Sequence, residues 1–421
     1  MKVVIAHPGV APFVQHTVRG LYEHEMLAYF QTAYLDHPDY PLANFLKKIG
    51  RVISEKYVAE LERRSFHEVP YPYIRTYPQW ELIRFLGSRL FKNPLISDAI
   101  WERGELSFDQ YVAKHLPKDL DAVYTYEHAA LATLQEGKRR KIATFYEQPS
   151  QHHRFFDQIY RHQIATYPEI VNNSSRLFGS PKTDIRNQRR DAELRTADYL
   201  MCNSTFTKRT LVNAGIASEK ITVTPYGFPV VDPKPRQLGD KVIFLNAGTQ
   251  NLRKGLHLLY RAWRKAQFSA DEAELWLVGK MTLPEQLVRD LPGSVKIWNS
   301  IPRSELMELY KQASVFVLPS LADGFAMVIS EAMSRGVPVI TTENTGGPDV
   351  ITHGKDGWIV PVGNEEALVN QMKWCVENKH RVEEVSIEAI ERAKQWQWSD
   401  YREAVAQKIK LKIDEHKTRS S

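Results

Sequence analysis

The stretch DGFAMVISEAMSRGVPVITT (323–342) carries the strongest structural signal in the chain. The apolar run SVFVLPS (314–320) before it predicts a buried strand, and VPVITT (337–342) predicts the next one. Between them, FAMVISEAMSRG (325–336) has a helical pattern, with Gly336 as its expected stop. A strand, a helix and a second strand in this order predict one unit of a parallel sheet.

Two acidic residues in this unit raise a chemical question. Asp323 is expected just before the helix, and Glu331 about two turns into it. Free backbone N–H groups and the helix dipole at that end suit a phosphate. Glu331 can accept hydrogen bonds from two neighbouring hydroxyls, as a ribose presents them, and Asp323 from the hydroxyls of a sugar. A helix cap and an exposed helix residue explain the same two acids, so the pair alone leaves both interpretations open.

Short β-branched runs alternate with helical patterns through both halves of the chain. In the first half we expect strands at 2–6, 120–127, 141–147, 197–203 and 221–227, and helices at 12–30, 129–140 and 204–215. In the second half we expect further strands at 241–248, 274–279 and 295–299, and helices at 255–266, at 369–378 and from Ser399 onward. This alternation predicts mainly parallel sheets with helices on both faces.

The chain of 421 residues is too long for one hydrophobic core. Residues 230–240, VVDPKPRQLGD, are rich in proline and charge and predict a linker. We therefore expect an α/β protein with two doubly wound, Rossmann-like domains, 1–229 and 241–395, that face each other across a cleft. Ligands of such sheets bind beyond the carboxyl ends of the strands, so the cleft is the expected site.

The stretch 323–342 resembles the E-x7-E signature of the retaining GT-B glycosyltransferases of family 4, commonly written EGFGLVxxEAMAxGxPVIAT. Asp323 replaces the first acid of that signature, and Ala326 replaces a glycine. The resemblance implies that Glu331 binds the ribose of a sugar donor and that Asp323 approaches the transferred sugar. It also implies that the donor lies against the backbone of Gly324, Phe325 and Ala326.

A second resemblance concerns LNAGTQNLRKGLHLLYRAW (245–263), which is similar to the strand, loop and helix that hold the donor diphosphate in this family. Lys254 occupies the family's lysine position, and Gly248 lies in the preceding loop. Thr249 stands where the family has an arginine, so Arg253 is the expected replacement. Two adjacent cations would neutralise a diphosphate leaving group. The resemblance implies catalysis by Arg253 and Lys254 with no metal or other cofactor, and UDP or GDP as the nucleotide.

In this family a polar residue of the first domain contacts the transferred sugar. The corresponding region, TFYEQPSQHH (144–153), carries Glu147 at the end of a strand, and His128 ends the preceding strand. We take both as candidate catalytic residues. The nearby histidines lack the spacing of a zinc site. HPGVAP (7–12) is expected to bring Gly9 to the cleft beside the donor phosphate.

Three further segments, 197–229, 344–368 and 396–411, resemble the same family. The second of them contains Gly346 and Gly347, which would let a backbone loop approach the donor. The third resembles a terminal helix, so residues 396–421 are expected to fold back on the first domain.

The net charge is +6, and residues 45–93 hold ten Lys and Arg against five Glu, with aromatic residues between them. A solvated helical face and a peripheral contact with an anionic membrane both explain this segment. No recognition motif points to nucleic acid. The two cysteines, the absence of a signal-peptide pattern and the lack of an apolar run of about 18 residues predict a cytoplasmic location, or the inner face of a membrane.

The resemblance to this family thus implies a retaining hexosyltransferase of polysaccharide biosynthesis. It would move a sugar from a nucleoside diphosphate to a glycan, a lipid-linked or a small-molecule acceptor. A nucleotide-sugar 2-epimerase of the same architecture would instead consume the donor without an acceptor. A non-catalytic subunit would bind the nucleotide without turnover.

Overall fold

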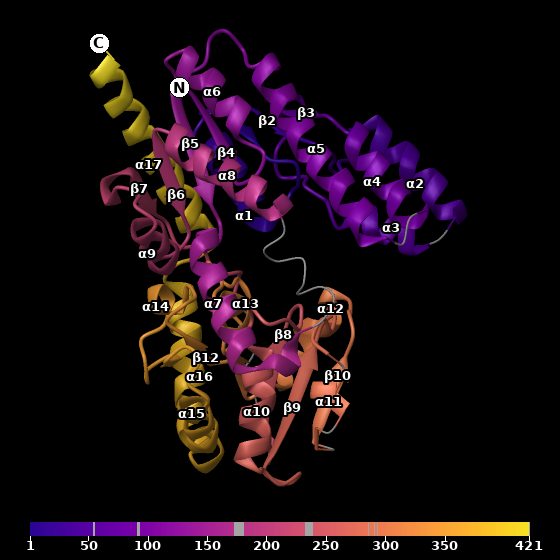
Figure 1. The fold of residues 1–421 in the computed structure, drawn as a ribbon, viewed down its shortest axis with the longest axis vertical. Helices are drawn as coiled ribbons and strands as arrows, with labels where there is room; N and C mark the ends of the chain where they lie inside the picture. The colour runs from indigo at the N-terminus through magenta and orange to yellow at the C-terminus, as the bar shows by residue number, and fades with distance from the viewer. Residues whose placement is uncertain are drawn as a thin grey trace.

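The computed structural model describes residues 1–53, 55–90, 93–171, 181–231, 239–284, 286–289, 291–292 and 294–420. Two parallel sheets, each covered by helices on both faces, form two domains stacked along the long axis of the molecule (Figure 1). This arrangement confirms the predicted fold class. Residues 232–238 of the expected linker lie outside the described residues.

The first sheet has the strand order β3-β2-β1-β4-β5-β6-β7. Its strands are β1 (Val3–Ala6), β2 (Leu27–Thr32), β3 (Ile74–Thr76), β4 (Ala122–Tyr126), β5 (Ala143–Gln148), β6 (Tyr199–Cys202) and β7 (Ile221–Val223). Its helices are α1 (Pro12–Glu23), α2 (Pro41–Ile53), α3 (Glu55–Glu62), α4 (Gln79–Leu90), α5 (Pro94–His115), α6 (Leu131–Arg139), α7 (His153–Thr166), α8 (Pro181–Thr196) and α9 (Thr205–Asn213). The central strands are buried along their whole length, because helices cover both faces of the sheet.

The second sheet has the order β10-β9-β8-β11-β12-β13. Its strands are β8 (Val242–Ala247), β9 (Ala273–Val278), β10 (Val295–Trp298), β11 (Val315–Leu318), β12 (Val339–Thr342) and β13 (Gly357–Val360). Its helices are α10 (Leu256–Ala266), α11 (Gln286–Arg289), α12 (Arg303–Gln312), α13 (Val328–Met333), α14 (Gly347–Val350), α15 (Glu365–Glu377) and α16 (Lys379–Lys394). In both sheets the strand order reverses beside the first strand, which is the place where such folds bind ligands.

One predicted helix, 12–30, is wrong in its second half. Helix α1 ends at Glu23, and Glu25 adopts a left-handed conformation with φ of +56°. The following residues form strand β2, which pairs with β1. The aromatic run LAYFQT fits a buried strand, and the sheet offers its backbone a partner that the helical pattern does not reveal.

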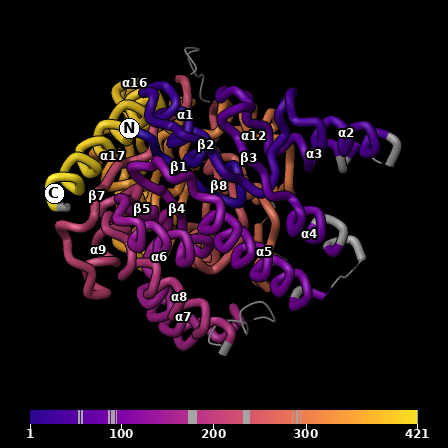
Figure 2. The backbone as a smooth tube through the Cα atoms, turned by 90° about the horizontal axis from the view of Figure 1, so that it is seen from above, coloured from indigo at the N-terminus to yellow at the C-terminus, as the bar shows by residue number. Residues whose placement is uncertain are grey.

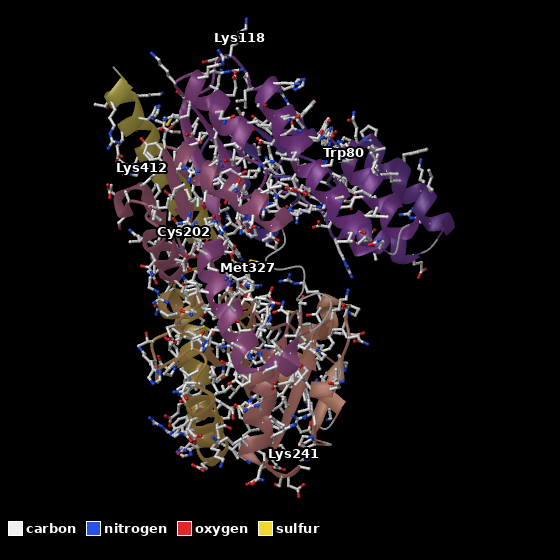
Figure 3. The ribbon with its side chains drawn as sticks, viewed as in Figure 1. Trp80, Lys118, Cys202, Lys241, Met327 and Lys412 are labelled. Atoms are coloured by element: carbon white, nitrogen blue, oxygen red, sulfur yellow. The ribbon has the colours of Figure 1, made fainter. Side chains whose placement is uncertain are left out.

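The helix predicted for 325–336 is also shorter than expected. It begins only at Val328, because Ala326 has φ of +60° and cannot belong to a right-handed helix. Met327 lies at the junction of the two domains, whereas Lys118 and Lys241 mark their far ends (Figure 3). The residues just before α13 therefore form a loop that faces the first domain.

Helix α17 (Trp398–Ser420) runs along the first domain beside α1 (Figures 1 and 2). Tyr401 and Thr17 share a hydrogen bond between their hydroxyls (2.8 Å), and Arg402 pairs with Glu23 (2.6 Å). On the opposite side, α2, α3 and α4 project away from the first sheet as an arm. None of the described helices combines the length and the apolar character needed to cross a membrane.

Polar contacts connect the two domains. Asp349 accepts hydrogen bonds from the Thr205 backbone N–H (3.0 Å) and hydroxyl (3.2 Å). Helix α7 of the first domain reaches α10 of the second, where His257 Nε2 lies 2.8 Å from Gln163 Oε1. The described conformation is therefore one in which the sheet edges are held close to each other.

Candidate active site

Two loops at the carboxyl end of the second sheet are hydrogen-bonded to each other. The loop after β8 spans 248–255, and the loop after β11 spans 319–327. The Leu321 N–H donates to the Arg253 carbonyl (2.9 Å), and the Arg253 guanidinium donates to the Ala322 carbonyl (3.0 Å). These bonds hold charged side chains from both loops at one edge of the sheet.

Asp323 forms ion pairs with both cations of this edge. Its carboxylate lies 3.0 Å from Arg253 Nη1 and 3.9 Å from Lys254 Nζ. The Lys254 side chain is only 12% exposed. Burial lowers the pKa of its ammonium group, while the negative charge of Asp323 acts in the opposite direction. The structure thus places Asp323, which was predicted to approach the transferred sugar, beside Arg253 and Lys254, which were predicted to bind the donor diphosphate.

Two glycines give Lys254 its position. Gly248 has φ of +128°, and a Cβ there would lie 2.7 Å from Lys254 Nζ. Gly255 has φ of +69°, and a Cβ there would lie 1.9 Å from the Pro319 carbonyl oxygen. A side chain at Gly255 would displace this loop, and one at Gly248 would displace the Lys254 side chain, so the Lys254 ammonium group can lie against bare backbone beside Gly248.

The predicted donor-facing backbone, 324–326, is tightly enclosed. A Cβ on Gly324 would lie 2.9 Å from the Ser150 Cα, which belongs to the first domain. A Cβ on Gly346 would lie 2.6 Å from the Phe325 ring, and the Gly346 N–H donates to the Phe325 carbonyl (3.2 Å). Ala326 keeps the left-handed conformation that a glycine adopts without strain. This loop therefore lies between the Gly346 turn and the first domain.

Glu331 lies on α13 and is mostly buried, with 17% of its side chain exposed. Burial raises the pKa of its carboxyl group, while Arg303, Lys254 and Arg335 act to lower it. Arg303 Nη2 donates to Glu331 Oε1 at 3.0 Å. Arg303 was not among the predicted site residues, because it lies on a different helix, α12, and only the fold brings it to Glu331.

Gly9 lies in the loop after β1, at the carboxyl edge of the first sheet. Its N–H donates to His7 Nδ1 at 2.8 Å. Burial lowers the pKa of His7 to about 4, and its Nδ1 atom also lies 2.7 Å from the Gly9 carbonyl oxygen. The ring of His7 also packs edge-on against Tyr126 (4.8 Å between centroids). The sequence places Gly9 in the cleft loop, but His7, which fixes that loop, was not anticipated.

Glu147 is buried at the end of β5, with 2% of its surface exposed. It accepts hydrogen bonds from the hydroxyls of Tyr124 and Tyr226, both at 2.6 Å. Burial raises the pKa of its carboxyl group to about 7. Tyr226 in turn packs edge-on against Phe325 at 5.2 Å between centroids. Glu147 thus lies one aromatic layer behind the donor-facing loop.

His128 follows β4 with φ of +83° and lies 2.7 Å from Arg190 through its Nε2 atom. Burial lowers the pKa of His128 to about 4. It lines a cavity of about 250 Å³, which we term the first-domain cavity. The other lining residues are Glu127, Ser150, Gln151, His153, Phe156, Asp157, Thr183, Asn187 and Arg190.

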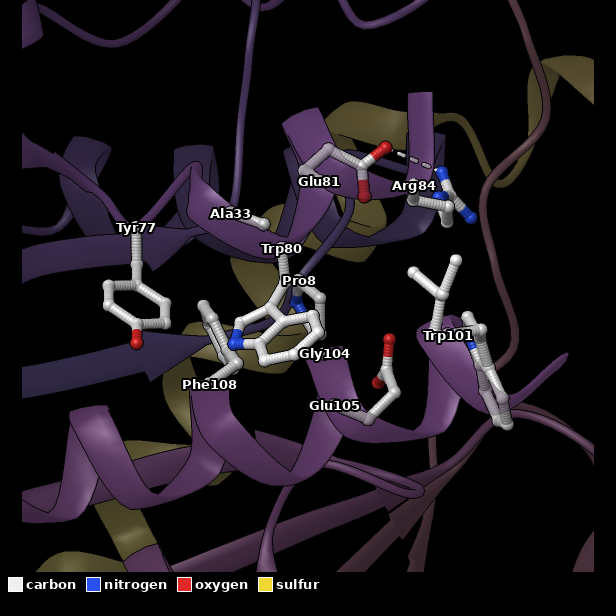
Figure 4. A pocket seen from close by; sticks show the side chains of 11 residues that line it. Pro8, Ala33, Tyr77, Trp80, Glu81, Arg84, Trp101, Gly104, Glu105 and Phe108 are labelled. Carbon is white, nitrogen blue, oxygen red and sulfur yellow. Dashed lines mark hydrogen bonds and ion pairs between the residues drawn. The ribbon is translucent and has the colours of Figure 1, made fainter. Parts of the chain in front are cut away.

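A smaller cavity of about 20 Å³ lies between α4 and α5 (Figure 4). Trp80 and Trp101 form parts of its wall, and burial raises the pKa of Glu105 beside them to about 7. Its volume corresponds to roughly one water molecule. It is too small for a sugar and reflects the packing of the two helices.

The histidines at the start of α7 surround one carboxylate. His153 Nε2 lies 2.7 Å from Asp191 Oδ1, and His152 Nε2 lies 3.3 Å from the same atom. The three side chains could supply metal ligands within 4.8 Å of one another. However, Arg154 already pairs with the second oxygen of Asp191 (2.7 Å). A hydrogen-bonded ion pair explains the group, and the prediction of no metal stays a prediction.

The second half of the chain matches a known protein family. Residues 231–396 match the family model described as "Glycosyl transferases group 1". These residues form a glycosyltransferase group 1 domain. The matched range contains the charged cluster of Arg253, Lys254 and Asp323, together with Glu331. The first domain lies outside the range.

Curated proteins resemble the glycosyltransferase domain at moderate identity. The chain is 29% identical over 175 residues to the amylovoran biosynthesis glycosyltransferase AmsK of Erwinia amylovora. It is 28% identical over 230 residues to the putative colanic acid biosynthesis glycosyltransferase WcaL of Salmonella typhimurium. These alignments cover 38% and 51% of this chain, and 42% and 55% of the relatives. The chain thus spans about half the length of the curated relatives it matches.

Solved structures resemble both domains. The Anabaena protein HepE in complex with UDP has a TM-score of 0.62 at 16% identity, over 99% of this chain and 100% of that one. Sucrose-phosphate synthase from Thermosynechococcus elongatus has the same TM-score and identity, over 98% and 99%. Together they show that the two-domain fold is of the GT-B type.

Proposed function

We propose that this protein is a retaining hexosyltransferase of family 4 that uses a nucleoside diphosphate sugar, with UDP or GDP as the nucleotide. It would transfer the sugar to a glycan, a lipid-linked or a small-molecule acceptor in polysaccharide biosynthesis. The named activities of AmsK and WcaL support a biosynthetic glycosyltransferase. The UDP and UDP-glucose complexes of HepE support a nucleotide-sugar donor.

The observation that carries the proposal is the ion-pair cluster of Arg253, Lys254 and Asp323 at the domain junction. A diphosphate needs two or more positive charges, and these two cations lie side by side at the sheet edge. In the structure Asp323 pairs with both cations, and the group of three keeps a net positive charge. A donor diphosphate would take over Arg253 and Lys254 and release Asp323 toward the hydroxyls of the transferred sugar.

The proposed reaction needs no nucleophile from the protein. The oxygen of the acceptor hydroxyl forms a bond to the anomeric carbon as the bond from that carbon to the β-phosphate oxygen breaks. The hydroxyl proton passes to the departing phosphate oxygen. Arg253 and Lys254 stabilise the negative charge that develops on this oxygen, and the closed domains exclude water.

Transfer is favoured over epimerisation by the first-domain cavity. A 2-epimerase needs no room for a second substrate, whereas a transferase must hold an acceptor next to the donor. A cavity of about 250 Å³ adjoins Ser150, which contacts the donor-facing loop at Gly324. This space supports the transferase assignment.

We also propose that α2 contacts an anionic membrane surface. Phe45 and Ile49, one helical turn apart, are 58% and 38% exposed, and Lys48 and Arg51 next to them are exposed as well. Lys47 is not available for this role, because it pairs with Asp36 (2.7 Å). Phe91 and Lys92 of the predicted basic segment lie outside the described residues.

The membrane contact can be tested by sedimentation with anionic and neutral vesicles. We expect salt-sensitive binding to anionic vesicles that is weakened by Phe45→Ser. Ile387→Ser is the matched control, because Ile387 is equally exposed but lies on α16 in the second domain. Equal binding of the two variants would contradict the proposal.

The donor assignment is tested by thermal stability in the presence of UDP, GDP, ADP and their sugars. A ligand at 100 times its Kd should stabilise the fold by about 2.7 kcal/mol. We expect one nucleotide to stabilise the wild type and to lose most of this effect in Glu331→Ala. If no nucleotide stabilises either protein, the donor site is wrongly assigned.

A further inference from the structure

The first-domain cavity lies next to the donor-facing loop, but no residue of that loop lines it. Ser150 donates a hydrogen bond to Glu127 Oε2 at 3.4 Å. The same residue lies so close to Gly324 that a Cβ there would stand 2.9 Å from its Cα. Asn203 fixes the preceding turn by donating to the Pro149 carbonyl (2.7 Å). One short turn of the first domain thus separates the cavity from the proposed donor.

The charges of the cavity disfavour a phosphorylated ligand. Arg190 is the only Lys or Arg among the described lining residues, and its charge is paired with Glu127, although its buried Nε makes no hydrogen bond among the described residues. It lies 3.2 Å from Glu127, donates to Asn187 Oδ1 at 2.9 Å, and contacts His128 Nε2 at 2.7 Å. Glu127 and Asp157 add two carboxylates, so the lining is net negative when its histidines are neutral. This negative charge would repel the phosphate group of a ligand.

Glu127 itself is ionised. Burial opposes its ionisation, but the positive charge of Arg190 and hydrogen bonds from Gln148 and Ser150 help to hold the pKa of Glu127 below its usual value. An ionised carboxylate has several acceptor positions, and Arg190 and Ser150 occupy only part of them. Such a group binds the hydroxyls of a sugar well, because charge-assisted hydrogen bonds are the strong ones.

Two other lining residues have unused hydrogen-bonding atoms. Gln151 Oε1 and His153 Nδ1 are buried and have no hydrogen-bond partner among the described residues. Such atoms usually find a partner in a folded protein. Phe156 adds an aromatic side chain to the same wall. Polar groups beside one aromatic ring are a suitable environment for the hydroxyls and the apolar face of a sugar.

The size of the cavity limits what it can hold. A volume of about 250 Å³ corresponds to roughly eight water molecules in the liquid. This is slightly below the usual range for drug-sized ligands. One sugar ring fits, whereas an oligosaccharide would have to extend out of it.

We propose that the first-domain cavity binds the terminal sugar ring of the acceptor and that this ring is uncharged. Glu127 accepts hydrogen bonds from its hydroxyls, and Gln151 provides a second polar contact. This inference rests on the proposed function, since an acceptor subsite has meaning only in a transferase. The inference specifies that the acceptor ring is a neutral sugar. A sugar phosphate is disfavoured, because the cavity has no unpaired cation to bind the phosphate.

The test is ligand-observed saturation-transfer NMR on the full chain in the presence of UDP or GDP, whichever binds. The probes are methyl glucoside, methyl galactoside, methyl mannoside and glucose 6-phosphate. We expect a signal from at least one neutral glycoside, at least a tenfold loss of affinity in Glu127→Gln, and no signal from the phosphate. Glu136→Gln is the control, because Glu136 is an ionised residue of the same domain that pairs with Arg139 and Arg140 on and beside α6.

Gln151→Met is a second variant, since Glu127→Gln removes the partner of the half-buried Arg190. It keeps the side-chain length and removes an oxygen that has no partner among the described residues, so the fold should tolerate it. Binding of neutral glycosides that survives in both variants overturns the proposal. Preferred binding of glucose 6-phosphate overturns the assignment of an uncharged acceptor.

The failure of this inference can be told apart from failure of the proposed function. If the nucleotide binds and depends on Glu331, but no neutral glycoside binds in its presence, only the acceptor assignment is wrong. If no nucleotide binds at all, the donor site is wrong and the cavity loses its proposed role with it.

Discussion

Gly324 of the glycosyltransferase domain meets Ser150 of the first domain so closely that a Cβ at residue 324 would lie 2.9 Å from the Ser150 Cα. The Pro149 carbonyl oxygen would be even nearer, at 2.2 Å. A methyl group at Gly324 must therefore push the two domains apart or displace the loop of Asp323.

Gly324→Ala is expected to lower kcat/KM by about 100-fold, because a displacement of about 1 Å at a reacting centre can cost that much. Nucleotide binding to the second domain should change much less, since Arg253 and Lys254 remain in place. Steady-state kinetics and nucleotide titration measure the two effects separately. Gly354→Ala is the control, because a Cβ there meets nothing within 4 Å and leaves the domain junction untouched, although its positive φ adds local strain.

Lys254→Met should weaken binding of the nucleoside diphosphate by at least tenfold. The variant keeps the length of the side chain and removes the charge that faces the diphosphate. Isothermal titration calorimetry with UDP and with UMP measures the effect, which should be larger for the diphosphate. Equal losses for both nucleotides would place Lys254 away from the β-phosphate.

Glu331→Ala should remove the preference for a ribose over a deoxyribose. A hydrogen bond to a charged group contributes about 1.5–3 kcal/mol, or roughly a tenfold to hundredfold difference in affinity. Competition between a nucleoside diphosphate and its 2′-deoxy form tests this. Wild type should discriminate and the variant should not. If Glu331→Ala still discriminates, Glu331 does not bind the ribose and only pairs with Arg303.

The contribution of Glu147 to stability should fall as pH rises from about 5 to 8. Burial raises the pKa of this carboxyl group from 4.5 to about 7, so the folded state binds a proton more tightly than the unfolded chain does. The neutral form is therefore stabilised at low pH, and ionisation above pH 7 costs roughly 3 kcal/mol. Glu147→Gln should gain stability relative to wild type as the pH rises.

Chemical denaturation at pH 5 and pH 8 measures this difference. Glu136→Gln serves as the control, because its arginine partners lower the pKa of Glu136 to about 2. Glu136 is therefore ionised in both conditions and should show no such trend. A parallel response of the two variants would mean that Glu147 is ionised in the folded protein at neutral pH.

Ala326→Gly should stabilise the fold by about 1 kcal/mol. Ala326 has φ of +60°, where an alanine is strained by about 1–2 kcal/mol and a glycine is not, although glycine loses more entropy on folding. Thermal or chemical denaturation measures the gain. Ala322→Gly, in the same loop at a residue with negative φ, should destabilise instead.

Much of the second domain could be predicted from the sequence. Its strands are short β-branched runs, and the positions of Arg253, Lys254, Asp323 and Glu331 follow from local motifs at their ends. The exceptions are local backbone effects. The helix expected from residue 325 begins at Val328, because the chain passes Ala326 in a left-handed conformation.

The first domain was less predictable. The sequence of strand β2 has the pattern expected for the end of a helix. It forms a strand only because β1 and β3 lie on either side of it. Gly9 was expected to lie beside the donor. Its N–H donates a hydrogen bond to His7, and no sequence motif predicts this bond. The arm of α2, α3 and α4 follows no motif of the sequence analysis.

The sequence by itself determined the α/β class, the division into two domains and the charged residues at the edge of the second sheet. These features follow from periodicity and from residues adjacent in the chain. Only the tertiary structure decided which groups face one another: Arg303 with Glu331, Ser150 with Gly324, and Glu127 with Arg190. Their distances depend on how separate helices and loops pack, and packing is a property of the whole folded chain rather than of any stretch of it.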